Sequence, residues 1–521
     1  MIFSKKTTDP TIEKVCEKTG WHSKKAEKQM DAAKELGLSY KLYLKHEAWN
    51  LSEEEIKALV GRLQRQKESR ERAIKTICER TGCAPETAAE GLNRAAACGI
   101  TRKQYLKKCG WDLSPEELPQ LAEALAKAEE LRLQRSSFYI DAVCRKSGWD
   151  RPKAEAEMNR FLEMGITYLK YAQSSFWEMD AETEQKAVQE ILAYKDTISD
   201  NKEVYRREIM EKTGWSRGKT ELEVLKCKNI CGASYEDFLV FKLYECTPQQ
   251  QREYVTLDMF IRMRLTYNDH MEAKRNFDNK AVFNEKFSPY IHRRWFVNTD
   301  LSWEDFCRRT DGISDFLVKP IAATQGKGIY KLHLSADEKE KRAAYESLTQ
   351  ENTAIIEEYI HQHESVAAFC PSSVNTLRIT TLYLDGKCHF LYAVFRMGQG
   401  SVVDNFHAGG IAASVDTKTG IVITDAADLA ANTYPVHPTS GLTIKGFRIP
   451  HWDQILATCE EIAPIIAKTH LVGWDFAITP DGIDLIEGNP GASYVVAQIP
   501  HVAERKGLRK TMIDPYLTLP Y

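Results

Sequence analysis

The sequence predicts an α+β protein in which an all-α repeat array comes first and a mixed domain of helices and strands follows. Up to about residue 250 the 521-residue chain is rich in Lys, Glu, Ala and Leu, and poor in β-branched runs, which is typical of helices. From about residue 315, short β-type runs such as LRITTLYL, FLYAVFRM and IDLIE lie between Gly, Asp and Pro residues. We therefore expect helical repeats over 1–250, a connecting segment over 251–314, and the mixed domain over 315–521.

The composition narrows the possible function classes. The charge is balanced, with 71 Lys and Arg against 74 Asp and Glu, which weakens a role in binding nucleic acid. No apolar run is long enough to cross a membrane, and the start MIFSKKTTDP has no apolar core of signal-peptide length. The 13 cysteines are scattered and form no CxxC pair, which is typical of reduced thiols. We therefore expect a cytoplasmic protein.

One pattern occurs four times in the first half. It starts at a glycine in TGWHS, TGCAP, SGWDR and TGWSR, and these glycines are 62, 66 and 66 residues apart. A second glycine follows after 17 or 18 residues, and aromatic residues follow that glycine after 6 and 12 residues. A fixed period predicts a repeat array whose units bury their apolar faces against their neighbours. The four sets are Gly20, Gly37, Tyr43 and Trp49; Gly82, Gly99, Tyr105 and Trp111; Gly148, Gly165, Tyr171 and Trp177; and Gly214, Gly232, Phe238 and Tyr244.

Each repeat is expected to contain three or four short helices. The second glycine suits a left-handed helix C-cap, and Ser52 with Glu55 has the spacing of a capping box at the next helix. The repeated aromatics have two interpretations: packing between helices, or stacking platforms for a sugar or a nucleic acid. A docking surface for a protein, peptide or glycan is a further hypothesis for the array.

The second half contains candidate phosphate-binding residues. FLVKPIAATQGKGIYKL places Lys319 at the end of a strand and the Gly326–Gly328 loop before the next one. Glycines let backbone amides approach phosphate oxygens, and a lysine supplies positive charge. For this stretch alone, a glycine-rich hairpin turn is the alternative. The P-loop motif GxxxxGK[ST] is absent.

The stretch GWDFAITPDGIDLIEGNPGASY predicts a hairpin with oxygen ligands on one face. Asp475 lies in the first strand, and Glu487 and Asn489 lie in the second, beyond the PDG turn. Because side chains alternate along a strand, residues 487 and 489 point to the same face. Two carboxylates and an amide oxygen are suitable ligands for Mg²⁺. The alternative is a charged surface hairpin, but the apolar run IDLI before Glu487 disfavours it.

Taken in order, these elements resemble the ATP-grasp superfamily over roughly residues 270–521. The stretches VNTLRITT, VDNFHAGGIAASVD and GWDFAITPDGIDLIEGNPGA are similar to the sugar-transfer-associated ATP-grasp family, which is related to carboxylate–amine ligases. The resemblance implies a catalytic domain of two α+β subdomains. Such ligases usually carry a small α/β domain before the ATP-binding core. Helical repeats occupy that position here, which leaves the substrates undefined.

The resemblance also implies roles for individual residues. Lys280 and Lys319 would contact the ATP phosphates, with Lys286 as a competitor to Lys280. The loop would close over the phosphates, and the 356–360 segment would contact adenine. Asp475, Glu487 and Asn489 would hold Mg²⁺. The full implied ATP-binding set is Lys280, Lys319, Gln325, Gly326, Lys327, Gly328, Glu357, Glu358, Tyr359, Ile360 and, on the ribose, Glu364.

Four further residues are implied for the reaction itself. Arg378 and Arg396 would face the acceptor carboxylate or an acyl phosphate, and Asn405, His407 and the Gly409–Gly410 turn would line the same cleft. His407 has two interpretations. It is either a general base for an incoming amine, since imidazole titrates near neutral pH, or a hydrogen-bonded loop residue.

The expected reaction is ATP- and Mg²⁺-dependent ligation of a carboxylate to an amine through an acyl phosphate, in the modification of cell-surface glycans or peptides. No covalent enzyme nucleophile is required, in agreement with the absence of a GxSxG motif. The helical repeats would dock the acceptor or a partner. One alternative is a kinase-like phosphotransferase on the same fold, and another is a non-catalytic nucleotide-binding scaffold.

Overall fold

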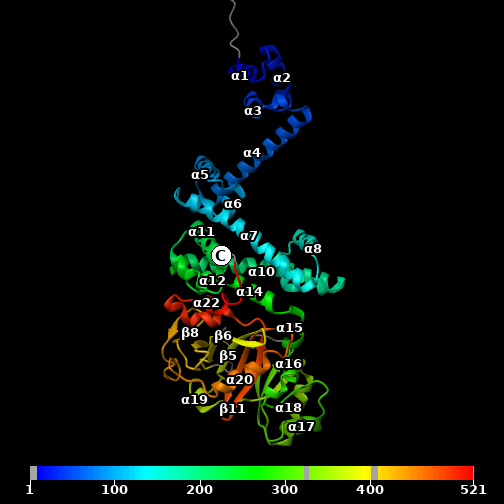
Figure 1. Cartoon of the computed structure of the whole chain (residues 1–521), viewed down its shortest axis with the longest axis vertical. Helices are drawn as coiled ribbons and strands as arrows, with labels where there is room; N and C mark the ends of the chain where they lie inside the picture. Colours follow the sequence, from blue (N-terminus) through cyan, green and yellow to red (C-terminus); the bar gives the residue numbers. More distant parts are fainter. Residues whose placement is uncertain (1–8, 322–327, 401–405, 407–408, 520) are drawn as a thin grey trace, which may run out of the picture. The chain divides into compact units, whose positions relative to one another are not determined.

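The computed structural model describes residues 9–321, 328–400, 406, 409–519 and 521, without the side chains of 194–200 (Figure 1). The chain forms two compact units, Met1–Ala122 and Glu123–Tyr521. The α+β class is confirmed, because the named strands all begin at Trp295 or later and the elements before that residue are helices. The compact units divide after Ala122, which is a different boundary from the one predicted at residue 250. The boundary at residue 250 therefore stays a prediction. No helix in the described residues has the length and apolar character needed to cross a membrane.

The first compact unit is helical. Ser52 and Glu55 form the predicted capping box at the start of α4, each side chain accepting from the backbone N–H of the other residue. The elements that begin in this unit are α1 (Pro10–Thr19), α2 (Ser23–Glu35), α3 (Tyr40–Lys45), η1 (Ala48–Asn50), α4 (Glu53–Thr81), α5 (Pro85–Ala97), α6 (Arg102–Lys107), η2 (Gly110–Asp112) and α7 (Glu117–Ser147).

The same order of elements follows each of the four pattern glycines: a helix, a shorter helix and a 3₁₀ helix. The first glycine of each pattern lies in the left-handed region, with φ between 70° and 73°, which glycine adopts without steric cost. Before each 3₁₀ helix, a residue other than glycine adopts a similar conformation, with φ between 49° and 52°. These residues are Glu47, Cys109, Ser175 and Lys242.

The two repeated aromatic residues contact each other within each of the four repeats. The centroids of Tyr43 and Trp49 are 6.2 Å apart, and the corresponding rings of the other three copies are 6.0–6.3 Å apart. The first ring of each pair is buried. These contacts agree with the packing interpretation of the aromatics.

The second compact unit contains further helices before its sheets. They are α8 (Arg151–Glu163), α9 (Tyr168–Ser174), η3 (Phe176–Glu178), α10 (Ala181–Thr213), α11 (Arg217–Cys231), α12 (Tyr235–Val240), η4 (Leu243–Glu245), α13 (Pro248–Gln251), α14 (Leu257–Tyr267), α15 (His270–Phe277), α16 (Lys280–Lys286) and η5 (Ser288–Tyr290).

A four-stranded antiparallel sheet has the order β1-β4-β2-β3. Its core is formed by Phe296, Phe316 and Ile356 from the strands and by Phe306 from the neighbouring helix α17. The elements are β1 (Trp295–Val297), α17 (Trp303–Arg309), β2 (Asp315–Pro320), β3 (Tyr330–His333), α18 (Glu338–Gln350) and β4 (Ala354–Glu358).

A seven-stranded antiparallel sheet follows, with the order β11-β10-β5-β6-β7-β8-β9, and α20 lies against it (Figure 1). Its strands are β5 (Thr376–Leu384), β6 (Lys387–Met397), β7 (Ile411–Val415), β8 (Ala426–Ala427), β9 (Thr433–Tyr434), β10 (Leu471–Thr479) and β11 (Gly482–Asn489). The associated helices are α19 (Glu364–Ala367), α20 (Trp452–Ile462), α21 (Tyr494–Gln498), η7 (Ile499–Glu504) and α22 (Arg509–Met512).

The two faces of this sheet belong to different cores. Leu377 and Ile379 pack into the core that includes α20. Arg378 lies between them and therefore points to the other face. Its cross-strand partner Val394 packs into the second core, which includes α14, α21 and the fourth repeat. The polar residues of the candidate site thus share a sheet face with helices that precede the strands in sequence.

Candidate functional site

The β10–β11 hairpin brings the three predicted metal ligands together. Asp475 is the cross-strand partner of Glu487, and Gly473 is the partner of Asn489. The Asn489 Nδ2 donates to Glu487 Oε1 at 2.9 Å, so the Asn489 amide nitrogen is used and its oxygen is left as an acceptor. The Asp475 side chain is buried, whereas the Glu487 side chain is 47 % exposed.

Two arginines from neighbouring strands hold Asp475. Arg378, its cross-strand partner on β5, donates from two guanidinium nitrogens to the two carboxylate oxygens, with a Nη2–Oδ2 distance of 2.5 Å. Arg396 on β6 donates from Nη1 to Oδ2 at 2.9 Å. Burial opposes ionisation of Asp475, but the two guanidinium groups outweigh it and hold the pKa of this carboxyl below its usual value. The structure therefore brings two predicted catalytic arginines to the predicted metal ligands.

Glu487 behaves in the opposite way. Desolvation by the surrounding protein and the negative charge of Asp475 raise the pKa of Glu487. Arg378 opposes this shift, since its Nη2 lies 3.7 Å from Glu487 Oε1. A bound cation would favour the ionised carboxylate, and the exposed side chain leaves it accessible. Glu487 and the Asn489 oxygen thus fit a divalent cation, while the oxygens of Asp475 already accept from the arginines. No three His, Cys, Asp or Glu side chains of the described residues converge as a metal site, so the Mg²⁺ set depends on Asn489.

A second charged cluster lies on the four-stranded sheet. The Lys319 Nζ on β2 is 2.5 Å from Glu357 Oε2 on β4, and Asn284 Nδ2 donates to Glu357 Oε1 at 3.0 Å. Arg293 donates to the same Oε1 at 2.7 Å. Burial alone would favour the neutral acid, but Arg293 and Lys319 hold the pKa of Glu357 well below its usual range. The Glu357 carboxylate is therefore occupied by protein cations.

Arg293 also connects the two sheets. Its Nη1 donates to Asp484 Oδ2 at 3.1 Å and to the carbonyl of Leu485 at 2.8 Å, both on β11. Asp484 further accepts from the backbone N–H of His292 at 2.8 Å. Strand β11 also carries Glu487, so the Lys319 cluster and the predicted metal ligands are tied to one strand.

Charged residues of both clusters influence the pKa of Lys280. Its Nζ donates to the carbonyls of Pro320 and Ile321 at 3.2 and 3.3 Å. Burial lowers the pKa of Lys280, and the charge of Lys319 adds to this effect, while Glu487 opposes it. The competing Lys286 is exposed at the end of α16. The structure thus favours Lys280 as the lysine near the site.

The remaining implied ATP-binding residues are placed as follows. Glu358 accepts from the backbone N–H of Arg294 at 3.0 Å, and Lys331 Nζ lies 4.3 Å from the ring centroid of Tyr359. Ile360 is half-buried, and Glu364 is exposed at the start of α19. Gly328 and Gly409 have positive φ angles of 73° and 100°. Gln325, Gly326, Lys327, Asn405 and His407 lie outside the described residues.

Sequence reasoning missed three members of the charged clusters: Asn284, Arg293 and Asp484. Asp484 had a signal, since a carboxylate inside the apolar run GIDLI must find a partner if the strand is buried. Arg293 had none, because its partners Glu357 and Asp484 are 64 and 191 residues away in sequence.

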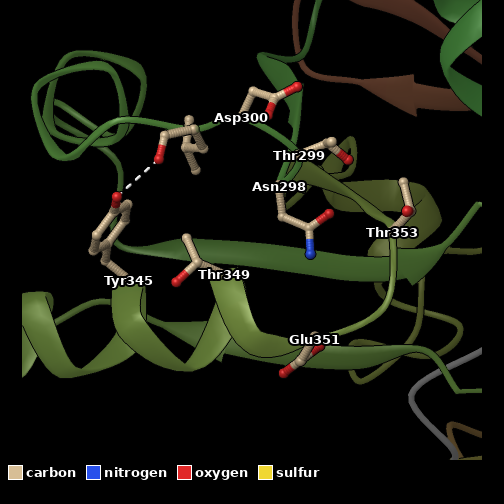
Figure 2. Close-up of a pocket in the computed structure, with 8 residues that line it drawn as sticks. Asn298, Thr299, Asp300, Tyr345, Thr349, Glu351 and Thr353 are labelled. Atoms are coloured by element: carbon tan, nitrogen blue, oxygen red, sulfur yellow. Dashed lines mark hydrogen bonds between the residues drawn. The ribbon is translucent and has the colours of Figure 1, made fainter.

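A separate cavity of about 390 Å³ lies beside β1 and α18 (Figure 2). Its rim is polar; for example, Tyr345 donates to the carbonyl of Leu301 at 2.8 Å. None of the predicted site residues line it. The lining residues are Asn298, Thr299, Asp300, Leu301, Tyr345, Thr349, Glu351 and Thr353.

With this geometry in place, residues 299–514 match a family model described as sugar-transfer associated ATP-grasp. The match covers less than half of the chain. The resemblance predicted from the sequence is confirmed for the segment, which contains both sheets except β1, and no family model matches the N-terminal helices. The ATP-grasp segment includes Lys319, Arg378, Arg396 and the metal-ligand hairpin, whereas Lys280 and Arg293 lie just before it.

Several solved ligase and synthetase structures are similar to the chain at low identity. A PsnB ligase structure with a minimal precursor is 13 % identical, covers 46 % of this chain and has a TM-score of 0.27; the chain spans 64 % of its length. D-alanyl-alanine synthetase A from Vibrio cholerae is 15 % identical, with 48 % of this chain and 68 % of that one covered and a TM-score of 0.28. D-alanine–D-alanine ligase from Bacillus anthracis is 12 % identical, with 46 % and 64 % covered and a TM-score of 0.26. No curated protein sequence matches the chain.

Proposed function

We propose that the chain is an ATP- and Mg²⁺-dependent ligase that joins a carboxylate to an amine through an acyl phosphate. One observation carries the proposal: Glu487 and Asn489 lie beside the Asp475 carboxylate that Arg378 and Arg396 hold. This set offers oxygens for a cation and guanidinium groups for oxyanions on one sheet face. The ATP-grasp family match over 299–514 supports nucleotide binding by the same segment.

The first step is phosphoryl transfer to the acid. A carboxylate oxygen of the substrate attacks the γ-phosphorus, the bond to the β-phosphate oxygen breaks, and ADP leaves. Lys280 and Lys319 supply positive charge to the transferred phosphoryl group. Glu487 and Asn489, with Asp475 beside them, would hold Mg²⁺, which neutralises phosphate charge during the transfer.

The second step forms the amide. The amine lone pair attacks the acyl carbon, the C–N bond forms, the bond to the phosphate oxygen breaks, and phosphate leaves while the amine loses its proton to solvent or to a base. Negative charge develops on the carbonyl oxygen in this step. Arg378 and Arg396 are suited to stabilise it, because their bonds to Asp475 fix the guanidinium groups before the substrate arrives.

The test is ATP turnover across a panel of amino acids, amino sugars and uronic acids, with ADP and phosphate measured separately. Glu487→Gln is compared with Asp481→Asn, a matched acid-to-amide change in the exposed turn of the same hairpin. Release of both products that requires an acid and an amine, and that is lost only in Glu487→Gln, supports the ligase. ADP with a stable phosphorylated product would instead indicate a phosphotransferase, and ATP binding without turnover would indicate a scaffold.

The biological substrate is proposed to be a glycan or a peptide that the chain modifies. The family description supports a sugar-containing substrate in glycan or peptide modification, and the helical repeats would dock the acceptor. A cytoplasmic location belongs to the same proposal, since ATP is supplied there. Cross-linking of a peptide or glycan acceptor to the repeats during turnover is the expected result, and cross-links confined to the sheets would argue against docking by the repeats.

A further inference from the structure

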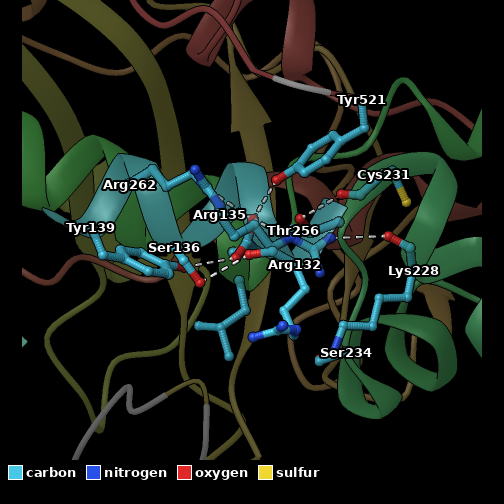
Figure 3. Close-up of polar contacts among 12 residues, drawn as sticks. Arg132, Arg135, Ser136, Tyr139, Lys228, Cys231, Ser234, Thr256, Arg262 and Tyr521 are labelled. Atoms are coloured by element: carbon cyan, nitrogen blue, oxygen red, sulfur yellow. Dashed lines mark hydrogen bonds and ion pairs between the residues drawn. The ribbon is translucent and has the colours of Figure 1, made fainter. Parts of the chain in front are cut away.

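Arg264 on α14 is a partly buried cation that faces no acid among the residues that the structure describes. Two residues earlier, Arg262 donates to Asp258 at 2.9 Å in a cluster with Tyr139 and Tyr521 (Figure 3). By contrast, within the described ranges the guanidinium of Arg264 has no hydrogen bond or ion pair. Burial lowers the pKa of Arg264, and no neighbouring carboxylate opposes this shift. An anion beside Arg264 would therefore be stabilised by a charge that the fold leaves uncompensated.

The Arg264 guanidinium lies against the turn that follows the metal-ligand hairpin. A Cβ atom built on Gly491 would lie 3.4 Å from Arg264 Cζ, and Gly491 is exposed to solvent. Asn268, at the end of α14, fixes this arrangement: its Nδ2 donates to the carbonyls of Leu471 and Pro490 at 2.8 and 3.2 Å. Arg264 is thus held beside an accessible turn two residues after Asn489.

The same turn packs against β10 at Gly473. A Cβ atom built on Gly473 would lie 2.5 Å from the Cβ of Ala492 and 3.1 Å from Cδ of Arg378. Ala492 therefore packs against Gly473, and the Arg378 side chain lies beside the same glycine. The 490–492 turn lies against Arg264 at one position and against the strands of the candidate site at the next.

The groups around Arg264 are mainly basic. Lys146 on α7 donates to the Asn268 carbonyl at 2.5 Å, and His270 begins α15. Burial lowers the pKa of both groups, and the charge of Arg264 contributes to each shift. The nearby acids act on these neighbours: Asp269 and Glu178 on Lys146, and Asp278 on His270. These acids therefore offset the charges of Lys146 and His270, whereas burial alone acts on the pKa of Arg264.

We infer that Arg264 binds an oxyanion, a carboxylate or a phosphate group of one of the two substrates, beside the 489–492 turn. A guanidinium group binds either oxyanion through two parallel hydrogen bonds. The inference rests on the proposed function, and it narrows the substrates to acids or amines that carry a further anionic group. Because α14 lies outside residues 299–514, the helical part of the chain would contribute this substrate contact.

Chemical labelling of the full chain with phenylglyoxal tests the inference without knowledge of the substrates. Labelling of each arginine is followed by peptide mass spectrometry with and without inorganic phosphate or acetate. The expected result is that an oxyanion slows labelling of Arg264 and leaves Arg275, an exposed arginine on α15, unchanged. Protection by phosphate alone assigns a phosphate group, and protection by acetate alone assigns a carboxylate. Labelling of Arg264 that neither anion changes would overturn the inference.

Variants separate this contact from a packing role. Arg264→Met has no arginine to label at this position, so protection by an anion cannot be measured there. The KM of the anionic substrate in the ADP assay is compared with that of the wild type instead. It is expected to rise about tenfold to a hundredfold while the KM for ATP stays constant, with partial recovery in Arg264→Lys and no change in Arg275→Met. Equal loss in Arg264→Met and Arg264→Lys with altered circular dichroism would indicate packing and overturn the inference. Protection of Arg264 in a protein that shows no ATP turnover would contradict only the proposed function.

Discussion

The guanidinium of Arg293 donates to the carboxylate of Glu357 at 2.7 Å, and both side chains are only 3–4 % exposed. The same guanidinium reaches Asp484 on β11 at 3.1 Å. Buried charges are tolerated only when they are paired, so this contact joins the four-stranded sheet to the seven-stranded sheet at a fixed position. It links the strand that pairs with Lys319 to the strand that carries Glu487.

The first prediction concerns the loss of this contact. Arg293→Met leaves Glu357 and Asp484 buried with one cation fewer, and breaking a buried pair in this way costs about 3–5 kcal/mol. Urea unfolding measures the change. Arg308→Met is the matched control, since Arg308 pairs with Asp305 on an exposed helix and such pairs contribute about 1 kcal/mol or less. Equal losses in the two variants would contradict the role of Arg293.

The second prediction is the acid dependence of the same cluster. The pKa of Glu357 is lower in the folded state than in the unfolded chain. Its contribution to stability is therefore complete above the unfolded pKa, about 4.3, and is lost as pH falls from there through the folded pKa. Glu357→Gln should be less stable near neutral pH and should show a flatter loss of stability on acidification. Parallel acid profiles of the two proteins, from unfolding midpoints at several pH values, would exclude this explanation.

The third prediction concerns Glu487, for which the sign is reversed. Its pKa is raised, so the folded state prefers the protonated acid, and this contribution to stability is lost as pH rises through the folded pKa. Without metal, Glu487→Gln should therefore be at least as stable as the wild type near neutral pH, and its stability should depend less on pH.

Metal binding by Glu487 should have a matching pH dependence. Protons compete with the cation for the carboxylate, so Mg²⁺ affinity should rise as pH increases through the raised pKa. Calorimetric titration with Mg²⁺ in the presence of ATP measures this, with Asp481→Asn as the control in the same hairpin. A wild-type affinity that does not change with pH, or that Glu487→Gln retains, would count against Glu487 as a ligand.

The hairpin could be predicted from sequence because its signals are local. A PDG turn, alternation of apolar residues and a two-residue spacing fix both Asp475 on β10 and the face of Glu487 and Asn489. The partners of Asp475 could be found only from three-dimensional contacts. The pairing of Arg378 and Arg396 with Asp475 depends on the β5–β10 and β5–β6 registers, which alternation alone does not set.

The role of Glu357 could not be predicted fully from the sequence. The ATP-grasp resemblance implied that Glu357 contacts the nucleotide, whereas its carboxylate is bonded to Arg293, Lys319 and Asn284. A buried carboxylate needs compensation, but sequence does not say which distant cation supplies it. The adenine role of the 356–360 segment stays a prediction, and any contribution of Glu357 would be through the position of Lys319. The Arg264 contact was missed for the same reason, since α14 precedes the turn at Gly491 by more than 200 residues.

The last prediction tests the close approach of the 490–492 turn to β10. In Gly473→Ala, the new Cβ would lie 2.5 Å from the Cβ of Ala492, which is too close for two carbon atoms, so the turn or the strand must shift. Overpacking of this kind costs about 1–3 kcal/mol, measured by urea unfolding.

Gly61→Ala is the control, because it is expected to raise the stability rather than lower it. Gly61 lies within α4, where a Cβ would meet only the flexible Arg65 side chain at 3.5 Å, and replacing a helical glycine by alanine stabilises by about 1 kcal/mol. Since the new Cβ would also lie 3.1 Å from Cδ of Arg378, and the turn lies beside Arg264, Gly473→Ala should reduce turnover as well as stability. A Gly473→Ala protein as stable and active as the wild type would mean that the turn does not need this contact to hold the site.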